Sequence, residues 1–290
     1  MRLQILVSAL ALAMSSLACQ VVIADDCDYT APREATLDAT GARDLVVDAG
    51  AGSLAIQGTP GAGELQARGT ACASREELLD GIRLEAEREG DTLHVRTVFP
   101  RNIRGNAALD LELEVPAELR VRVDDGSGSA VVRNVASLDL EDGSGSVEVA
   151  EIAGDATIED GSGSIDLRDV RGAVVIDDGS GSIDVLGVGG SVEVDDGSGG
   201  VDLRGIGGDV RISDGSGSMV IRDADGSVTV TEDGSGGIVI TGVGGSVLVR
   251  SDGSGSIRVE DVRGDFTVER DGSGGISFSN VDGRVSIPRD

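Results

Sequence analysis

Apolar residues recur at every second position in short runs along the C-terminal half of the chain, and glycine-rich turns separate the runs. In one unit, Ile165 and Leu167 alternate with polar residues. After a corner at Val170, the alternation resumes at Val174 and Ile176. Alternating β-branched residues between glycine turns are typical of β-strands. Each unit is therefore predicted to form two strands of about three to five residues.

The tetrapeptide Asp-Gly-Ser-Gly opens each unit and occurs nine times. The interval between successive copies lengthens along the chain, being 17 once, 18 four times and 19 three times. Such a regular period is typical of stacked coils. The three longest intervals carry one extra residue just before the aspartate, which predicts a bulge or a larger corner there. The nine aspartates are Asp125, Asp142, Asp160, Asp178, Asp196, Asp214, Asp233, Asp252 and Asp271.

Two short strands cannot bury their apolar side chains alone, so the units are predicted to stack. Equivalent strands would then pair in parallel about 4.8 Å apart, and inward residues would form columns. One expected column is Val147, Ile165, Ile183, Val201, Met219, Ile238, Ile257 and Ile276. The other is Ile152, Val170, Val188, Ile206, Ala224, Val243, Val262 and Val281. The sequence predicts an all-β fold, a parallel β-solenoid (a single-stranded, right-handed β-helix) in which the repeat interval is the length of one coil.

The N-terminal part is less regular. Residues 47–56 resemble a degenerate copy of the unit, and residues 93–98 and 109–115 alternate as strands. Ser74 and Glu77 have the spacing of a helix capping box. We expect a signal peptide at residues 1–24, a β-rich cap at 25–120 that continues the rod, and the solenoid at 121–290. The cap would cover one end, whose strands would otherwise stay unpaired.

The first residues have the pattern of a secretory signal, with Arg2 followed by an apolar stretch and small residues. Two cleavage sites fit this pattern. We favour cleavage after Ala24; the alternative is a lipoprotein box that leaves Cys19 as a lipidated N-terminus. No later window is apolar enough to span a membrane. The protein is expected to be exported to the periplasm, the outer membrane or the cell surface.

Cleavage after Ala24 leaves two cysteines, Cys27 and Cys72. An even pair in an oxidising compartment predicts a disulfide. The alternative is two free or metal-bound thiols. It is less favoured, because the chain has only one histidine to complete a metal site.

The composition of the chain constrains both its core and its partners. The chain of 290 residues has 45 glycines, which concentrate in the turns, and only one Tyr, three Phe and no Trp. The core must therefore be aliphatic and narrow. Acidic residues number 52 against 24 basic ones, for a net charge of −28. Such a charge excludes nucleic acid as a partner, because phosphate binding relies on clustered cations.

Stacking would place the nine aspartates in one column, next to a second acidic column that includes Asp124, Glu141, Glu159, Asp177, Asp195 and Glu232. Neighbouring charges about 4.8 Å apart repel by roughly 0.9 kcal/mol even in bulk water. The first explanation is local: each carboxylate accepts amide hydrogens of its own turn. The second is weak Ca²⁺ binding by the nine aspartates, and the third is an organic ligand. Neither the EF-hand nor the repeat-in-toxin spacing is met, and no other cofactor is expected.

The only histidine, His94, lies in an alternating stretch and is predicted to point outward. Histidine-based triads and multi-histidine zinc sites are thereby excluded. Uniform coils leave no long loops to build a cleft. We therefore expect no catalytic residues and no enzyme activity.

Three features together resemble a known family: Cys27-Asp28-Tyr29 near the mature N-terminus, a strand over residues 109–115 ending in Pro116, and the repeated Asp-Gly-Ser-Gly units. They are similar to the bacterial putative-adhesin family of β-strand-repeat envelope proteins, a domain of unknown function. The resemblance implies a β-solenoid in the cell envelope or at the surface, and it implies no established functional residues.

We therefore expect a noncatalytic structural or adhesive module whose partner is an envelope or surface protein or polysaccharide, with end-to-end self-association as a further expectation. The first alternative is an acidic surface rod that uses Ca²⁺ to bridge anionic envelope polymers. The second is a carbohydrate-active β-helix enzyme.

Overall fold

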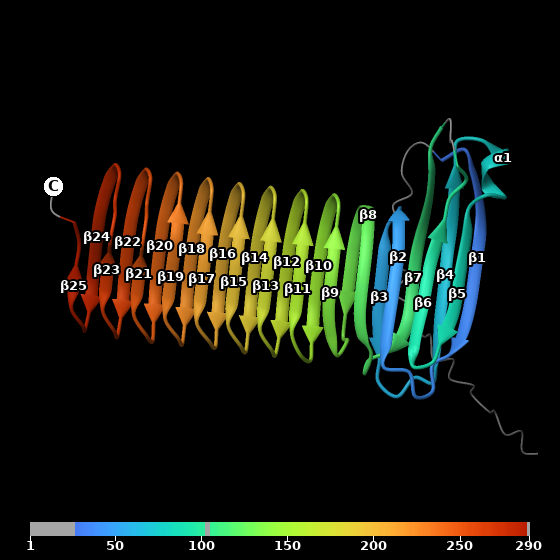
Figure 1. Cartoon of the computed structure of the whole chain (residues 1–290), viewed down its shortest axis with the longest axis horizontal. Coiled ribbons are helices and arrows are strands. Elements are labelled where there is room, and N and C mark those ends of the chain that lie inside the picture. The colour runs from blue at the N-terminus through green and yellow to red at the C-terminus, as the bar shows by residue number, and fades with distance from the viewer. Residues whose placement is uncertain (1–26, 102–104, 289–290) are drawn as a thin grey trace, which may run out of the picture.

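The computed structural model describes residues 27–101 and 105–288, which form an all-β rod with a broader N-terminal end (Figure 1). Stacked parallel coils make up the rod, so the predicted all-β parallel β-solenoid is confirmed. Its right-handedness stays a prediction. The predicted signal peptide and the cleavage sites at Ala24 and Cys19 lie outside the described residues.

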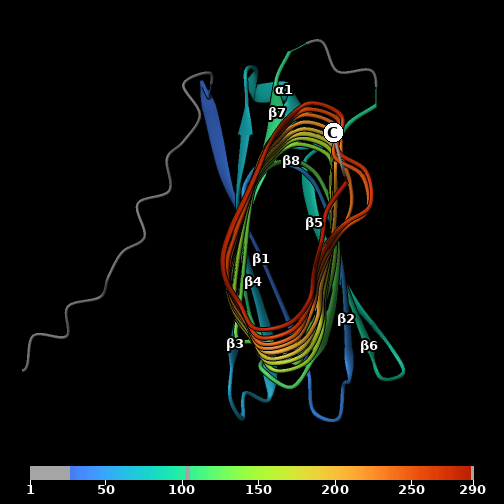
Figure 2. The same cartoon turned by 90° about the vertical axis from the view of Figure 1, so that its left-hand side faces the viewer.

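Each regular coil contributes one strand to each of two parallel sheets, here called sheet A and sheet B. Viewed along the rod, the coils superimpose as a flattened oval (Figure 2). The strands of sheet A in the regular coils are β10 (Gly145–Ile152), β12 (Gly163–Val170), β14 (Gly181–Val188), β16 (Gly199–Ile206), β18 (Gly217–Ala224), β20 (Gly236–Val243), β22 (Gly255–Val262) and β24 (Gly274–Val281).

Sheet B is built from shorter strands. They are β9 (Ser137–Asp142), β11 (Ala156–Asp160), β13 (Val174–Asp178), β15 (Val192–Asp196), β17 (Val210–Asp214), β19 (Val228–Asp233), β21 (Val247–Val249), β23 (Phe266–Val268) and β25 (Val285–Ser286). One long strand, β8 (Arg120–Arg133), pairs with β9 in sheet B and with β10 in sheet A. It therefore joins the two sheets at the start of the regular array.

Both predicted columns of apolar residues exist in register. Val147 pairs with Ile165, and Ile152 pairs with Val170. The same alignment continues through each later pair of sheet A strands to the last coil. Members of the columns are almost fully buried except in the last coil, and they belong to one continuous core cluster. A slip by one residue would turn each of these sets toward solvent.

Two details of the coil differ from or refine the expectation. Sheet A strands are longer than the predicted three to five residues, because the chain turns within the strand at a residue with positive φ, such as Asp169 at 56°. The predicted bulge is confirmed in the first of the three longest intervals. There the register between β17 and β19 shifts after Ile212, and Thr231 is the extra residue.

The degenerate copy of the unit stacks on the regular array. Its strands β2 (Asp44–Ala51) and β3 (Leu54–Thr59) both pair in parallel with β8. Beyond them, β6 (Thr92–Val98) pairs in parallel with β2, and β7 (Ala107–Pro116) pairs in parallel with β3.

The strands at the N-terminal end then run antiparallel. In sheet A, β4 (Glu64–Ala73) pairs with β7, and β1 (Tyr29–Asp38) pairs with β4. In sheet B, β5 (Arg83–Glu89) pairs with β6. These hairpin-like additions lie over the end of the rod in Figure 1. The boundaries at residues 24 and 120 stay a prediction.

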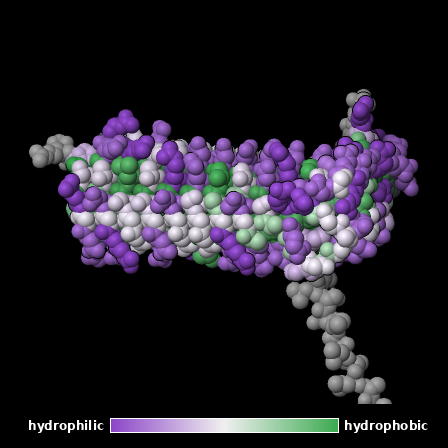
Figure 3. Space-filling view, turned by 60° about the horizontal axis from the view of Figure 1, so that its bottom comes forward, coloured by the Kyte–Doolittle hydropathy of each residue, from purple (hydrophilic) through white to green (hydrophobic). Residues whose placement is uncertain are grey.

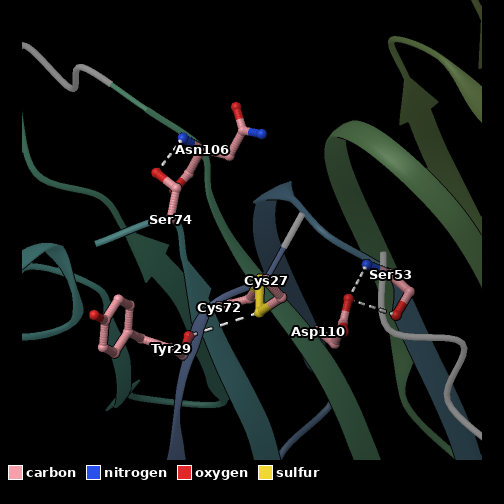
Figure 4. Close-up of a disulfide and its surroundings, with 7 residues drawn as sticks. All are labelled: Cys27, Tyr29, Ser53, Cys72, Ser74, Asn106 and Asp110. Atoms are coloured by element: carbon pink, nitrogen blue, oxygen red, sulfur yellow. Dashed lines mark hydrogen bonds between the residues drawn. A yellow bond between two sulfur atoms is a disulfide. The ribbon is translucent and has the colours of Figure 1, made fainter. Parts of the chain in front are cut away.

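The described residues contain one short helix, α1 (Glu76–Leu79). The predicted capping box is wrong, because the N-cap residue is Arg75 and it makes no side-chain capping hydrogen bond. Ser74 Oγ instead accepts the Asn106 N–H at 3.0 Å, which ties the end of β4 to the segment before β7 (Figure 4). No helix among the described residues has the length and apolar character needed to span a membrane.

Candidate functional site: the aspartate ladder

The nine aspartates of the Asp-Gly-Ser-Gly turns, here called the aspartate ladder, point into the rod. Asp160, for example, lies two residues after buried Ile158 and therefore on the same, inward side of β11. The first alternative, an acidic surface rod, assumes that these carboxyl groups lie on the surface, and this assumption is wrong. The eight buried members are between 1% and 5% exposed: Asp125, Asp142, Asp160, Asp178, Asp196, Asp214, Asp233 and Asp252.

The residues just before the ladder form the exposed acidic column. Alternation along the strand turns them outward, and all six predicted members are exposed: Asp124, Glu141, Glu159, Asp177, Asp195 and Glu232. A shallow groove of about 500 Å³ runs along both columns in the first coils. The outer surface of this corner is therefore acidic, and a second set of carboxyl groups lies directly beneath it.

The predicted local turn is confirmed for five of the ladder aspartates. Asp160 Oδ1 accepts the N–H of Ser162 at 3.1 Å, which closes an Asx turn. The same bond measures 2.9 to 3.2 Å at Asp142, Asp178, Asp196 and Asp214. Each of these carboxyl groups thus has one oxygen satisfied by its own turn.

The second oxygen of these carboxyl groups has no partner. Asp160 Oδ2 is buried without a hydrogen bond, as are the Oδ2 atoms of Asp142, Asp178, Asp196 and Asp214. Unpartnered buried oxygens also occur on Asp125, Asp233, Asp252 and Asp271. A buried polar atom without a partner costs about 1 to 3 kcal/mol, and more when it is charged.

Burial makes these carboxyl groups hard to ionise. It raises the pKa of Asp125 to about 6, with the charge of Asp142 as the second cause. It also raises the pKa of Asp196 to about 6 and that of Asp233 to about 7, and in both the next aspartate of the ladder is the second cause. The pKa is raised, with burial as the first cause, at Asp142, Asp160, Asp178, Asp214 and Asp252 as well.

Weak Ca²⁺ binding by the ladder stays a prediction. Among residues 27–101 and 105–288, no group of three or more His, Cys, Asp or Glu side chains is arranged to hold a metal ion. Because the ladder carboxyl groups lie inside the corner, they cannot reach an external polymer as the bridging alternative requires.

The predicted disulfide is present. Cys27 and Cys72 are bonded, with their Cα atoms 5.5 Å apart. The bond fastens the segment before β1 to β4, and Cys27 Sγ lies 3.6 Å from the Tyr29 carbonyl oxygen (Figure 4). The alternative of free or metal-bound thiols therefore does not apply. Nearby, Asp110 Oδ1 accepts both the N–H and the O–H of Ser53, each at 2.9 Å.

His94 points outward from β6, between buried Leu93 and Val95, as predicted. Two residues later in the same strand, the guanidinium of Arg96 pairs with Glu85 of the neighbouring strand β5 at 2.8 Å. The surroundings of His94 are those of an ordinary outward residue on a strand.

The outer face of sheet A carries features that the sequence analysis did not single out. Asp202 accepts hydrogen bonds from Arg204 in its own strand, and it pairs with Arg222 of the next coil at 3.2 Å. In register between Arg168 and Arg204 lies Leu186, which is 51% exposed. Figure 3 shows rows of hydrophilic, neutral and apolar residues running along the rod.

No family model matches the chain, and no curated protein matches it. Among solved structures, it is similar to a "putative adhesin" from Parabacteroides merdae, with 14% identity, 90% of this chain and 97% of that chain covered, and a TM-score of 0.34. It is also similar to a "putative cell adhesion protein" from Clostridium sporogenes, with 12% identity, 70% and 100% covered, and a TM-score of 0.30.

A third similar structure is a "putative lipid binding protein" from Parabacteroides distasonis, with 14% identity, 89% and 97% covered, and a TM-score of 0.33. The first two names are consistent with the family that the sequence motifs resemble. At such TM-scores the backbones diverge, and neither fold nor function is transferred from these proteins.

Proposed function

We propose that this chain is an exported, noncatalytic β-solenoid that serves as a structural or adhesive interaction module of the cell envelope or surface. The observation that carries the proposal is the outer face of sheet A, where equivalent positions repeat at each coil along a straight rod. Such a face can offer many weak contacts to one extended partner, and linked weak contacts add up to strong binding.

The middle of this face has the composition of a protein interaction surface. Leu186 is exposed between Arg168 and Arg204, and the guanidinium groups of both arginines are held by aspartates of their own strands. Arginine is enriched where proteins bind partners, because it combines contact area with directed hydrogen bonds. The exposed Leu186 adds apolar area that binding would remove from water. The partner we propose is an envelope or surface protein or a polysaccharide.

Binding of the purified mature protein to envelope fragments from the producing cells tests the proposal. The fragments are sedimented, and the bound fraction is measured for the wild type and for Leu186→Asp. We expect the variant to lose most of the binding. Val175→Asp is the matched control, since Val175 is also exposed but lies on sheet B. Equal binding of all three proteins, or no binding by the wild type, contradicts the proposal.

The proposed location rests on the N-terminal sequence. Fractionation of the producing cells, with the mature N-terminus determined by mass spectrometry, distinguishes cleavage after Ala24 from lipidation at Cys19. A protein recovered from the cytoplasm with an intact N-terminus would contradict export. End-to-end self-association stays a prediction, which sedimentation velocity of the mature protein tests.

A further inference from the structure

The turns of the aspartate ladder provide hydrogen-bond donors for only part of its buried carboxyl oxygens. Each coil adds a buried carboxyl group to the column, and in coils such as those of Asp160 and Asp178 only one oxygen of the group has a partner. An ionised carboxylate can only accept hydrogen bonds, so two neighbouring carboxylates cannot satisfy each other. Their charges also repel in a setting that water screens poorly.

The distance between coils allows neighbouring carboxyl groups to form a hydrogen bond with each other. Parallel strands lie about 4.8 Å apart. The two oxygens of one carboxyl group lie about 2.2 Å apart, given C–O bonds of about 1.2 Å. A carboxyl group whose oxygens are aligned with the rod therefore leaves roughly 2.6 Å to the next group, within the range of about 2.5 to 2.7 Å for an O–H···O⁻ hydrogen bond.

We propose that the aspartate ladder is a chain of shared protons, in which a neutral carboxyl group of one coil donates its O–H to the carboxylate of the next. One proton for each pair of aspartates supplies a donor for an otherwise unpartnered oxygen. It also halves the negative charge of the column. The ladder is thus a proton-binding column that links coil to coil inside the rod.

The last coils come closest to this arrangement. Asp233, Asp252 and Asp271 pair in register. Their carboxyl groups lie close enough along the column to share hydrogen bonds once one member of each pair is protonated. Without such a proton no donor stands between them, and buried oxygens of all three have no partner. The raised pKa of Asp233, about 7, agrees with a proton held there near neutral pH.

The charged groups that act on the ladder are acidic. Along the column each aspartate meets other aspartates of the ladder, as Asp196 meets Asp178 and Asp214. From the sheet B strands, the adjacent members of the exposed acidic column add to the repulsion at Asp125, Asp178 and Asp196. On the sheet A side the turn residues are glycine and serine, which carry no charge. Arg122 faces outward and pairs with Glu141 at 3.1 Å.

A cation between coils is the competing solution. Ca²⁺ requires about six to eight oxygen ligands, whereas the gap between two coils offers two carboxyl groups. Water cannot complete the shell there, since the free oxygens are buried. The observations therefore favour protons, and Ca²⁺ becomes one outcome of the test.

The test compares two double variants of the full mature chain. Asp160→Asn with Asp196→Asn replaces alternate ladder positions by neutral side chains whose amide N–H can donate to one neighbouring carboxylate. Glu159→Gln with Asp195→Asn removes the same two charges from the adjacent, exposed acidic column. Infrared spectra report the band of protonated carboxyl groups between pH 5.5 and 8, and the melting temperature is measured over the same range.

The sign of the pH effect follows from the direction of the pKa shifts. The folded ladder holds protons that the unfolded chain releases near pH 4, so stability falls as the pH rises through 6 to 7. We expect the wild type to show protonated carboxyl groups at pH 6 and to melt several degrees lower at pH 8 than at pH 5.5. The ladder variant should lose part of the infrared band and melt higher than the wild type at pH 8.

The control variant should keep both the band and the pH dependence of the wild type. The absence of protonated carboxyl groups at pH 6 overturns the proposal, as does a ladder variant that melts lower than the wild type at pH 8. A wild type that gains several degrees from Ca²⁺ at pH 8 and loses the infrared band on adding it also overturns it, in favour of a metal ladder.

Discussion

Gly199 lies directly against Gly181 of the preceding coil. A Cβ atom on Gly199 would stand 1.5 Å from the Gly181 carbonyl oxygen, and the φ angle of Gly199 is +153°. The second glycine of the turn is therefore required twice, once by its own backbone conformation and once by the coil below it. The same close approach recurs at every regular coil.

Gly199→Ala should destabilise the protein by about 3 kcal/mol or more, because strain at positive φ adds to a clash with backbone that cannot move away. Gly200→Ala in the same turn is the control. The nearest atom to a Cβ there is Ser218 Oγ at 3.7 Å, and the change should stay within about 0.5 kcal/mol. Urea unfolding of both variants measures the difference. Equal effects would show that the stacking of the turns does not depend on the missing side chain.

The disulfide should stabilise the N-terminal end. The two cysteines are separated by 45 positions in the sequence. Replacing both Cys27 and Cys72 by Ser should lower the free energy of unfolding by roughly 3 to 4 kcal/mol, the entropic contribution that chain models assign to a closed loop of this size. Denaturant unfolding of the oxidised, reduced and double-serine proteins measures it. Reduced wild type and the serine variant should behave alike, and an unchanged midpoint on reduction would contradict the expectation.

The corner within each sheet A strand stores strain that glycine can release. Glu151 has a φ of +61°, and Gly187 occupies the equivalent place two coils later with a φ of +75°. Glu151→Gly should stabilise the protein by up to about 1 kcal/mol, because a side chain is costly in this region. Gly187→Glu should destabilise it by a similar amount. Thermal melting of both variants checks the opposite signs, and a loss of stability in both would contradict the argument.

The ion pairs on the outer face of sheet A should matter little for stability. Asp202 joins Arg204 and Arg222, but both arginine side chains are about half exposed, at 53% and 42%. Asp202→Asn should cost no more than about 1 kcal/mol, and less at high salt. Unfolding at two salt concentrations measures this. A larger loss that salt does not reduce would contradict it.

The regular part of the rod was predictable because two periods coincide. Alternation along each strand assigns Ile165 and Leu167 to the inside, and the repeat interval then assigns Ile183 and its successors to the same column. The inward position of Asp160 was predictable by the same rule, since it lies two residues after Ile158. We did not predict this inward position, because aspartates are almost never fully buried unless they are paired.

The cap was less predictable, because its strands pair through contacts distant in sequence. The antiparallel pairing of β1 with β4, and of β4 with β7, leaves no fixed interval in the sequence. The wrong capping box has the same origin. Ser74 has the spacing for a helix cap, but the neighbouring Asn106 backbone competes for its hydroxyl group. Local patterns do not reveal such competition.

The bulge at Thr231 has a consequence for how such a chain can change in length. The intervals before it are the shorter ones, and every interval from there to the last turn keeps the extra residue. Each coil pairs its backbone with that of the next coil. A residue inserted in one coil must therefore be matched by an inserted residue in the next, or the hydrogen bonds between the two coils are lost at that point. The number of residues in one coil thus constrains the number in the next. An insertion confined to a single turn should be harder to accommodate than the same insertion repeated in every turn that follows.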